Sequence, residues 1–299
     1  MPEGDTIWRT AARLNLALCG TPLTRLELRW GELGGAGLLP ASTIGVVARG
    51  KHLLHRLDSG VTIHTHLRME GSWRIHPTAK VTPAQLADHH LRVLVSTSTW
   101  TALGLRLGMV DVWPTEQDEG WLAHLGPDVL GPDWDLDRAL ANLAGDESMS
   151  IGAALLDQTK LAGIGTFWAS EGLFLTRLSP WTPIGEIPEQ EQIGVVTGIR
   201  RLMRQATVSA VQSSTGRTRR GETSFVHARS GSPCRRCGIP IRVAMIGSAD
   251  RQRTMFYCPN CQGGLAPGDD GARQSPLGAA ERSRAIKRPR PKLRRALET

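Results

Sequence analysis

Short β-leaning runs alternate with turn-forming residues through the first third of the chain. Gly, Pro, Asp and Ser separate these runs, and such residues commonly end strands. The runs cover residues 23–28, 43–47, 52–57, 61–66, 71–75, 90–95 and 107–112. A series of short strands with this punctuation predicts a sandwich or a barrel over residues 21–113.

Helical periodicity is clearest near the start of the chain and after residue 150. Residues 4–18 predict an amphipathic helix. Its apolar face consists of Ile7, Ala11, Leu14 and Leu18. Residues 151–161 and 167–177 predict two further helices around the glycine turn 163–165. Helix, turn, helix is a DNA-binding arrangement in several folds, but it is also a common way to turn a corner. Residues 114–149 are rich in Pro, Gly and Asp and predict a linker with a short helix.

Four of the five cysteines form two CxxC pairs with twenty residues between them. They are Cys234, Cys237, Cys258 and Cys261. This spacing is typical of a zinc ribbon with a tetrahedral four-thiolate site. Two disulfides or a redox CxxC fit less well, because neither a signal peptide nor an apolar run long enough to span a bilayer is present. A reducing cytoplasm is therefore expected, where such pairs bind metal. Cys19 is expected to be a buried apolar residue at a helix end.

The composition allows several cores and favours a polyanionic partner. The chain has 299 residues, 40% of them hydrophobic, and a formal net charge of +8. That length can bury more than one core together with a small metal module. Residues 265–299 contain nine Lys or Arg against four Asp or Glu, so most of the excess positive charge lies there. Residues 264–299 thus predict a disordered basic tail that contacts phosphates or remains a solvated extension.

The first residues carry candidate chemistry. Once Met1 is removed, the secondary amine of Pro2 becomes the first group of the chain and lies beside the carboxylate of Glu3. An amine can attack an electrophilic carbon and form an iminium. A helix start nearby lowers the pKa of that amine by up to about 0.7 unit, which increases its neutral fraction. A Met-Pro start without chemistry, a Glu3 that only complements the helix dipole, and a solvated Lys51 at a strand end remain open alternatives.

Several motifs in one order make the chain similar to a known family. The first is Pro2-Glu3-Gly4, followed by Lys51 after Gly50. The others are residues 66–72 (HLRMEGS), 124–128 (HLGPD), 155–158 (LLDQ), 163–165 (GIG), 169–171 (ASE), 233–238 (PCRRCG) and 252–258 (QRTMFYC). Over residues 1–262 the chain resembles the formamidopyrimidine-DNA glycosylase and endonuclease VIII family of base-excision repair enzymes. The opening residues 3–6 (EGDT) resemble the endonuclease VIII branch.

The resemblance implies an α+β multidomain fold. Its parts are an N-terminal β-sandwich flanked by helices, a helix-two-turn-helix domain and a zinc ribbon holding one structural Zn²⁺, with damaged DNA in the cleft. The implied boundaries are 1–118 for the catalytic sandwich, 119–149 for the linker, 150–225 for the helix-two-turn-helix, 226–263 for the ribbon and 264–299 for the tail. A monomer in the bacterial cytoplasm, associated with the nucleoid and not with a membrane, is expected.

The resemblance also implies roles for individual residues. Pro2 would attack C1′ of a flipped-out damaged nucleotide, Glu3 would transfer protons, and Lys51 would hold a phosphate and assist the leaving base. Arg253 would grip the phosphates beside the lesion, and Met69 would fill the space left by the flipped nucleotide, its alternative being ordinary core packing.

Three departures from the family pattern are visible. Thr166 stands where the family usually has an asparagine that donates to a DNA phosphate, and a hydroxyl offers one donor where an amide offers two. Residues 227–229 (HAR) replace a more usual Tyr-Gly-Arg. Residues 103–112 lack the Asp-Pro-Arg-Arg-Phe-Gly stretch of the formamidopyrimidine branch, so weaker discrimination of the opposite base is expected.

A bifunctional DNA glycosylase and abasic-site lyase acting on oxidised bases, pyrimidines above all, is the leading functional hypothesis. The alternatives are a binding protein for damaged or abasic DNA without turnover, which Thr166 keeps open, and an unrelated zinc-ribbon nucleic-acid factor. The pocket loop at residues 213–224 contains Arg217, Arg219 and Arg220 but no pattern that identifies the damaged base.

Overall fold

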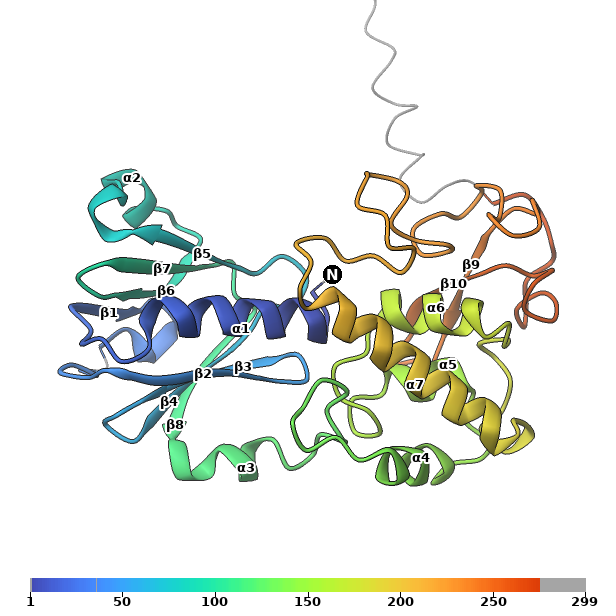
Figure 1. Ribbon diagram of the computed structural model, residues 1–299, viewed down its shortest axis with the longest axis horizontal. Helices are drawn as coiled ribbons and strands as arrows, with labels where there is room; N and C mark the ends of the chain where they lie inside the picture. Colours follow the sequence, from blue (N-terminus) through green and yellow to red (C-terminus); the bar gives the residue numbers. More distant parts are fainter. Residues whose placement is uncertain (1, 36, 275–299) are drawn as a thin grey trace, which may run out of the picture.

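Helix α1 (Gly4–Leu18) begins at the junction of two lobes and runs along the first of them (Figure 1). The computed structural model describes residues 2–35 and 37–274. The helix has the predicted bounds, and its predicted apolar face is buried. No helix within these described ranges combines the length and hydropathy that a membrane span requires.

The first lobe is a sandwich of two antiparallel four-stranded sheets, with strand orders β1-β6-β7-β5 and β2-β3-β4-β8. The strands are β1 (Arg25–Leu28), β2 (Thr43–Arg49), β3 (His52–Leu57), β4 (Val61–His66), β5 (Ser72–Pro77), β6 (Leu91–Ser96), β7 (Trp100–Leu105) and β8 (Met109–Pro114). Inward-facing residues of both sheets and of α1 form one core. The short helix α2 (Pro83–Leu86) lies beyond the other face of the first sheet, where Leu86 packs on a leucine cluster. The structure therefore selects the sandwich over the barrel.

Strand β7 was not among the predicted strands. Its residues Ala102 and Gly104 have low strand propensity, so local sequence favours no strand there. Packing explains them, because a Cβ built on Gly104 would lie 2.7 Å from Leu107 Cδ1 and 3.2 Å from the Trp73 ring. The strand forms because its two neighbours and this close packing require it.

The second lobe is helical. Its elements are α4 (Leu136–Ala144), α5 (Ile151–Leu156), α6 (Thr166–Leu175) and α7 (Glu189–Ala206), reached through α3 (Asp118–Trp121). Helix α5 is shorter than the predicted 151–161 because Asp157 leaves the helical region and its carboxylate accepts from the Thr159 backbone N–H at 2.9 Å. The turn after it leads to α6, of which Thr166 to Phe174 are all buried. Helix α7 packs against α6 and completes the core.

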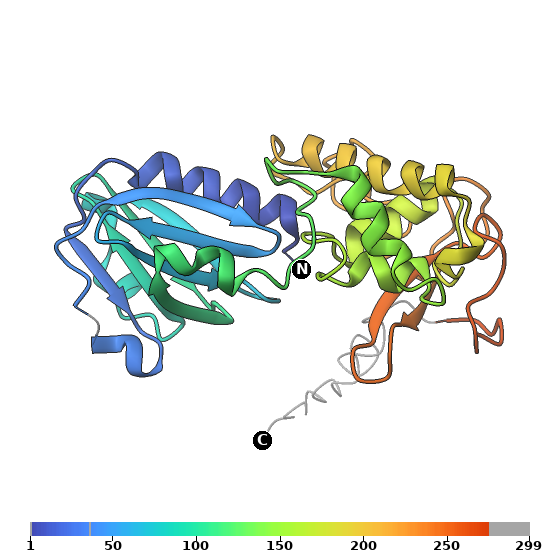
Figure 2. The same ribbon diagram turned by 90° about the horizontal axis from the view of Figure 1, so that it is seen from below.

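A two-stranded ribbon of β9 (Arg242–Ile246) and β10 (Arg253–Tyr257) projects from the second lobe (Figure 2). Residues 264–274 correct the predicted start of the disordered tail, because they pack on this ribbon. Asp269 pairs with Arg242 and accepts from the Tyr257 hydroxyl at 2.7 Å, and Ala266 is buried. The rest of the predicted tail, 275–299, lies outside the described residues.

Candidate active site

The carboxylate of Glu3 forms hydrogen bonds between the two lobes. Glu3 is 1% exposed and is the N-cap residue of α1. Its carboxylate accepts hydrogen bonds from the backbone N–H groups of Gly165 (2.9 Å), Phe167 (2.7 Å) and Trp168 (3.3 Å) in the second lobe. These amides form the N-terminus of α6, where unpaired donors and the helix dipole favour an anion. Glu3 therefore cannot rotate away without leaving buried amides unpaired.

The pKa of Glu3 lies near neutral pH. Burial raises the pKa of Glu3 to about 7, against the opposing effects of the Lys51 charge and the Phe167 amide. Desolvation thus outweighs the favourable contacts of the charged form. A carboxyl group with such a pKa can both give and take a proton at pH 7, which is the property of a general acid or base.

Glycines allow the backbone to approach this carboxylate closely. The Gly4 N–H donates to the Gly163 carbonyl at 2.9 Å across the lobe junction, and Gly163 has a φ of +102°. A Cβ on Gly165 would lie 2.4 Å from Glu3 Cδ. Any side chain at Gly165 would therefore displace Glu3, and one at Gly163 would strain the backbone.

Lys51 lies in the turn between β2 and β3, beside Glu3. Burial lowers the pKa of Lys51, the charge of Glu3 raises it and that of Arg253 lowers it. Glu3, Lys51 and Arg253 are therefore close enough for their charges to act on one another. Gly50, with a φ of +57°, precedes Lys51, and its N–H donates to Asp128 Oδ2 at 2.7 Å. The linker thereby fixes the turn that carries Lys51.

The other predicted residues differ in burial and lie on several elements. Pro2 is partly exposed and directly precedes Glu3. Met69 is 68% exposed in the loop between β4 and β5, which excludes ordinary core packing for its side chain. Arg253 is exposed at the loop end of the β9–β10 hairpin. Thr166 is the first residue of α6 and is buried, beside the amides that hold Glu3.

The predicted cysteine site is assembled at the base of the ribbon. The sulfurs of Cys234, Cys237, Cys258 and Cys261 all lie within 4.8 Å of one another. The Cys237 and Cys258 sulfurs are 3.5 Å apart. Such a cluster can hold a metal ion. The expectation for Cys19 is wrong: it is exposed, and its thiol donates to the Ile44 carbonyl.

Two family domains match the chain in sequence. Residues 1–111 match the formamidopyrimidine-DNA glycosylase N-terminal domain, and residues 125–218 match the formamidopyrimidine-DNA glycosylase H2TH domain. A probable endonuclease 8 2 of Streptomyces coelicolor is 43% identical over 267 residues, which are 89% of this chain and 96% of that protein. The chain belongs to the formamidopyrimidine-DNA glycosylase family. It is a DNA repair enzyme of the endonuclease 8 type, as the sequence predicted.

Other relatives support the assignment of the chain to this family. The DNA-(apurinic or apyrimidinic site) lyase Nei2 of Mycolicibacterium smegmatis is 39% identical over 262 residues, 88% of this chain and 99% of that protein. Lactococcus lactis formamidopyrimidine-DNA glycosylase, solved with DNA containing an abasic site, has a TM-score of 0.73 at 20% identity and covers 87% of this chain and 99% of that one. That similarity confirms the predicted fold.

A chain of histidines lies beside Lys51 in the glycosylase and was not predicted. His64 Nδ1 is 3.2 Å from Asp111 Oδ2, and His52 Nδ1 is 2.8 Å from His64 Nε2. Burial lowers the pKa of His52 to about 3 and that of His66 to about 4, so both are neutral at pH 7. Asp111 therefore accepts from His64, which in turn accepts from His52. The alternation of His64 and His66 along β4 is the sequence signal for this cluster.

Buried carboxylates outside the predicted set shape the glycosylase site. Asp5 accepts from the Trp168 indole at 2.8 Å and from Gln212 at 2.9 Å. Glu171 accepts from the backbone N–H groups of residues 225–227 at 2.7 to 2.8 Å, which orders the segment that follows the pocket loop. Both residues lie within motifs that supported the resemblance, Asp5 in residues 3–6 and Glu171 in residues 169–171, but neither was predicted as a site residue.

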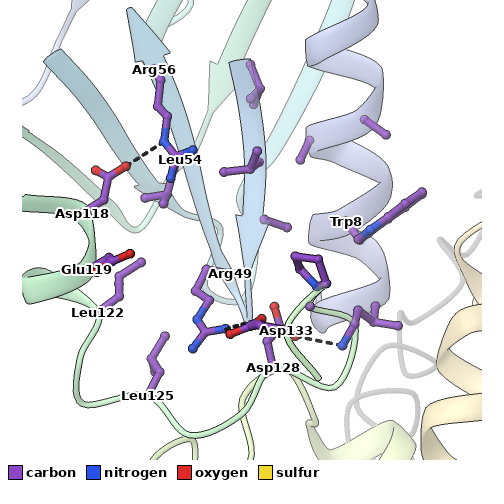
Figure 3. Close-up of a pocket in the computed structure, with 18 of the residues that line it drawn as sticks. Trp8, Arg49, Leu54, Arg56, Asp118, Glu119, Leu122, Leu125, Asp128 and Asp133 are labelled. Carbon is purple, nitrogen blue, oxygen red and sulfur yellow. Dashed lines mark hydrogen bonds and ion pairs between the residues drawn. The ribbon is translucent and has the colours of Figure 1, made fainter. Parts of the chain in front are cut away.

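A cavity of about 850 Å³ lies beside this site and not at it. It is bounded by α1, the β2–β3 hairpin and the linker, and Figure 3 shows the pairs Arg49–Asp133 and Arg56–Asp118 at its wall. None of the predicted catalytic residues lines it. The volume of a cavity does not by itself identify a reacting group, so this cavity assigns no chemistry to the residues around it.

Proposed function

We propose that this enzyme removes oxidised bases, with a preference for pyrimidines, and cleaves DNA at the resulting abasic site through a Schiff base on Pro2. One observation carries the proposal: Glu3, directly after the candidate nucleophile, is buried against the N-terminus of α6 and has a pKa of about 7. Burial also raises the pKa of the structural carboxylate Glu171, but only Glu3 lies directly after the candidate nucleophile, where a carboxyl with a pKa of about 7 can exchange protons with the reacting groups.

The chemistry follows from the neutral amine of Pro2. Its nitrogen attacks C1′, the C1′–base bond breaks and the base leaves with the bonding electrons and a proton. Glu3 protonates O4′ as the sugar ring opens, which gives an iminium between the nitrogen and C1′. Loss of the C2′ proton expels the 3′ phosphate, and a second elimination expels the 5′ phosphate. Hydrolysis of the imine frees Pro2, so a one-nucleotide gap with phosphate ends remains.

Charged and apolar residues around the nucleophile would hold the extruded nucleotide. Lys51 and Arg253 act on one region, so a DNA phosphate placed there would be held by both cations. Exposed Met69 is available to enter the duplex where the nucleotide has left. Thr166 offers a single hydroxyl at the start of α6, which supports weaker phosphate binding than an asparagine would give.

The preference for pyrimidines rests on the resemblance to the endonuclease VIII branch. A short loop bears on a second property, the discrimination of the base opposite the lesion. Only residues 106–108 separate β7 from β8. Gly108 in this loop packs against Arg68, because a Cβ there would lie 2.1 Å from Arg68 Cγ. A loop this short leaves little chain to contact the base opposite the lesion. Discrimination by that base is therefore expected to be weak.

The four cysteines fit a structural zinc ion. Ligands at about 2.3 Å in a tetrahedron place sulfurs about 3.8 Å apart, and the observed separations of 3.5 Å for one pair and at most 4.8 Å for all agree. Zinc would fix the base of the hairpin that carries Arg253.

We place the enzyme on chromosomal DNA in the cytoplasm, acting as a monomer.

Borohydride trapping on an abasic-site duplex tests the proposal. The mature enzyme should form a covalent adduct, and both Pro2→Gly and a form that retains Met1 should form much less. Glu3→Gln should bind the duplex but remove no base. An adduct on an internal lysine would refute the role of Pro2. Binding without any adduct would favour a damaged-DNA-binding protein that has lost turnover. A panel of lesion duplexes then tests the pyrimidine preference.

A further inference from the structure

A groove lined by arginines lies on the outer side of the second lobe. Arg200, Arg201 and Arg204 of α7 line it together with Thr197, Gln205 and Trp134, and its volume is about 340 Å³. We call it the α7 groove. The opposite side of α7 is buried in the helical core. Figure 2 shows α7 along one edge of this lobe and the β9–β10 hairpin, which carries Arg253, projecting from the opposite edge.

The arginines of this groove have no counter-ion within the described part of the chain. None of the three takes part in an ion pair or donates a side-chain hydrogen bond there. The Arg200 guanidinium lies 5.3 Å from the centre of the Trp134 ring, and its Nε is buried without a partner. Burial lowers the pKa of Arg200, and the charge of Arg204 lowers it further. The like charges therefore repel each other and have unused donors.

The carboxylates nearest to Trp134 in sequence are engaged elsewhere. Asp133 pairs with Arg49 at 3.2 Å, and Asp135 accepts from the Arg138 backbone N–H at 3.0 Å as the N-cap of α4. Neither is available to neutralise the groove without giving up a contact that anchors the linker. The positive charge of the α7 groove is therefore open to an external anion.

We propose that the α7 groove binds an acidic peptide segment of a partner protein. Two carboxylates of the peptide would pair with Arg200 and Arg204, and an apolar side chain between them would pack on Trp134. Guanidinium groups bind carboxylates through paired hydrogen bonds, and Trp and Arg are the residues that most often dominate protein interfaces. A groove that spans about two turns of one helix suits a short peptide, whereas duplex DNA requires an extended basic surface.

Fluorescence anisotropy with a short labelled peptide of aspartates around one phenylalanine tests the proposal. The full-length enzyme is first saturated with a duplex carrying an uncleavable abasic-site analogue, so that the DNA-binding region is blocked. The peptide should still bind. Arg200→Ala, Arg204→Ala and Trp134→Ala should each weaken binding about tenfold. Arg13→Ala, an exposed arginine of α1, should leave binding unchanged. All four variants should retain abasic-site cleavage, and the three arginine variants should retain the thermal stability of the parent enzyme, whereas Trp134→Ala should be less stable because Trp134 packs against the helical core.

Three outcomes would overturn the proposal. Loss of peptide binding on saturation with DNA would place the peptide in the DNA-binding region. Equal weakening by Arg13→Ala and Arg200→Ala would show unspecific attraction to positive charge. Displacement of the peptide by additional undamaged duplex would show that the groove binds nucleic acid. Should an alanine variant prove less stable, Arg200→Lys provides a milder change that keeps the charge but removes the paired donors, and it too should weaken peptide binding.

Discussion

Replacing Glu3 by glutamine should remove a pH dependence from the stability of the fold. A carboxyl whose pKa is higher in the folded than in the unfolded chain adds stability below its unfolded pKa, and this stability is lost as the pH rises through the folded pKa. Glutamine has the same shape but does not titrate. The parent enzyme should therefore lose stability relative to Glu3→Gln between pH 4.5 and pH 8.

The size of this change follows from the two pKa values. The pKa of about 7 for Glu3 in the folded chain lies about 2.5 above the ordinary glutamate pKa of 4.5. At about 1.36 kcal/mol per unit, the parent should lose about 3 kcal/mol relative to the variant over this range. Glutamine also turns an N–H₂ group toward the α6 amides in place of one acceptor, which costs roughly 1–3 kcal/mol at every pH. That constant penalty cancels when the two enzymes are compared across pH.

Urea unfolding followed by tryptophan fluorescence, at pH values from 4.5 to 8, measures the difference in the free energy of unfolding. Glu189→Gln, an exposed first-turn residue of α7, is the matched control and should show no pH-dependent difference from the parent. A flat difference for Glu3→Gln would refute the reasoning. It would mean that the three amide donors keep Glu3 ionised and offset its desolvation.

Further outcomes are expected at other positions. Gly163→Ala should cost about 1–2 kcal/mol in urea unfolding, because its φ of +102° strains any side chain, and a stability equal to the parent would contradict the argument from backbone strain. Met69→Ala should weaken binding to an abasic duplex roughly fivefold while the free energy of unfolding changes by less than about 0.5 kcal/mol, and a large loss of stability would instead indicate a packing role. Removal of residues 275–299, with eight Lys or Arg against two Glu, should flatten the salt dependence of DNA affinity without changing the cleavage products; altered products would contradict a purely electrostatic role. Thr166→Asn should tighten DNA binding in the same titration, and no change would show that this position does not contact a phosphate.

Local patterns predicted the elements whose packing follows a regular period. The buried face of α1, with its spacing of three and four residues, is an example. Strands β3 and β4 are mostly buried without alternation and were predicted from their β-leaning composition and the turn-forming residues around them. Strand β7 was missed because Ala102 and Gly104 are set by contacts with Trp73 and Leu107, which no local pattern contains. Helix α7 received no prediction, although Val195, Ile199 and Leu202 have helical spacing. The apolar spacing of these three residues is typical of an amphipathic helix, so local sequence does contain a signal for α7.

The candidate site likewise combines features that local sequence predicts with contacts between residues far apart in the sequence. The spacing of the cysteines was enough to predict that their sulfurs meet, because each pair lies in one short turn. The partners of Glu3 could not be predicted, because its bond to the Gly165 amide connects residues 162 positions apart. The histidine chain also depends on strand register, which pairs His52 with His66 and places His64 beside Asp111.

The carboxylate of Glu3 is fixed by amides that belong to the other lobe, so the end of the chain that is proposed to react is correctly placed only while the lobes are in contact. Their separation would withdraw the acid from the helix that stabilises it. If the two lobes separate, the enzyme should therefore lose their alignment and its reactivity together. Residues of this joint that never meet a substrate, Gly165 among them, should then behave in kinetic experiments as though they belonged to the catalytic machinery.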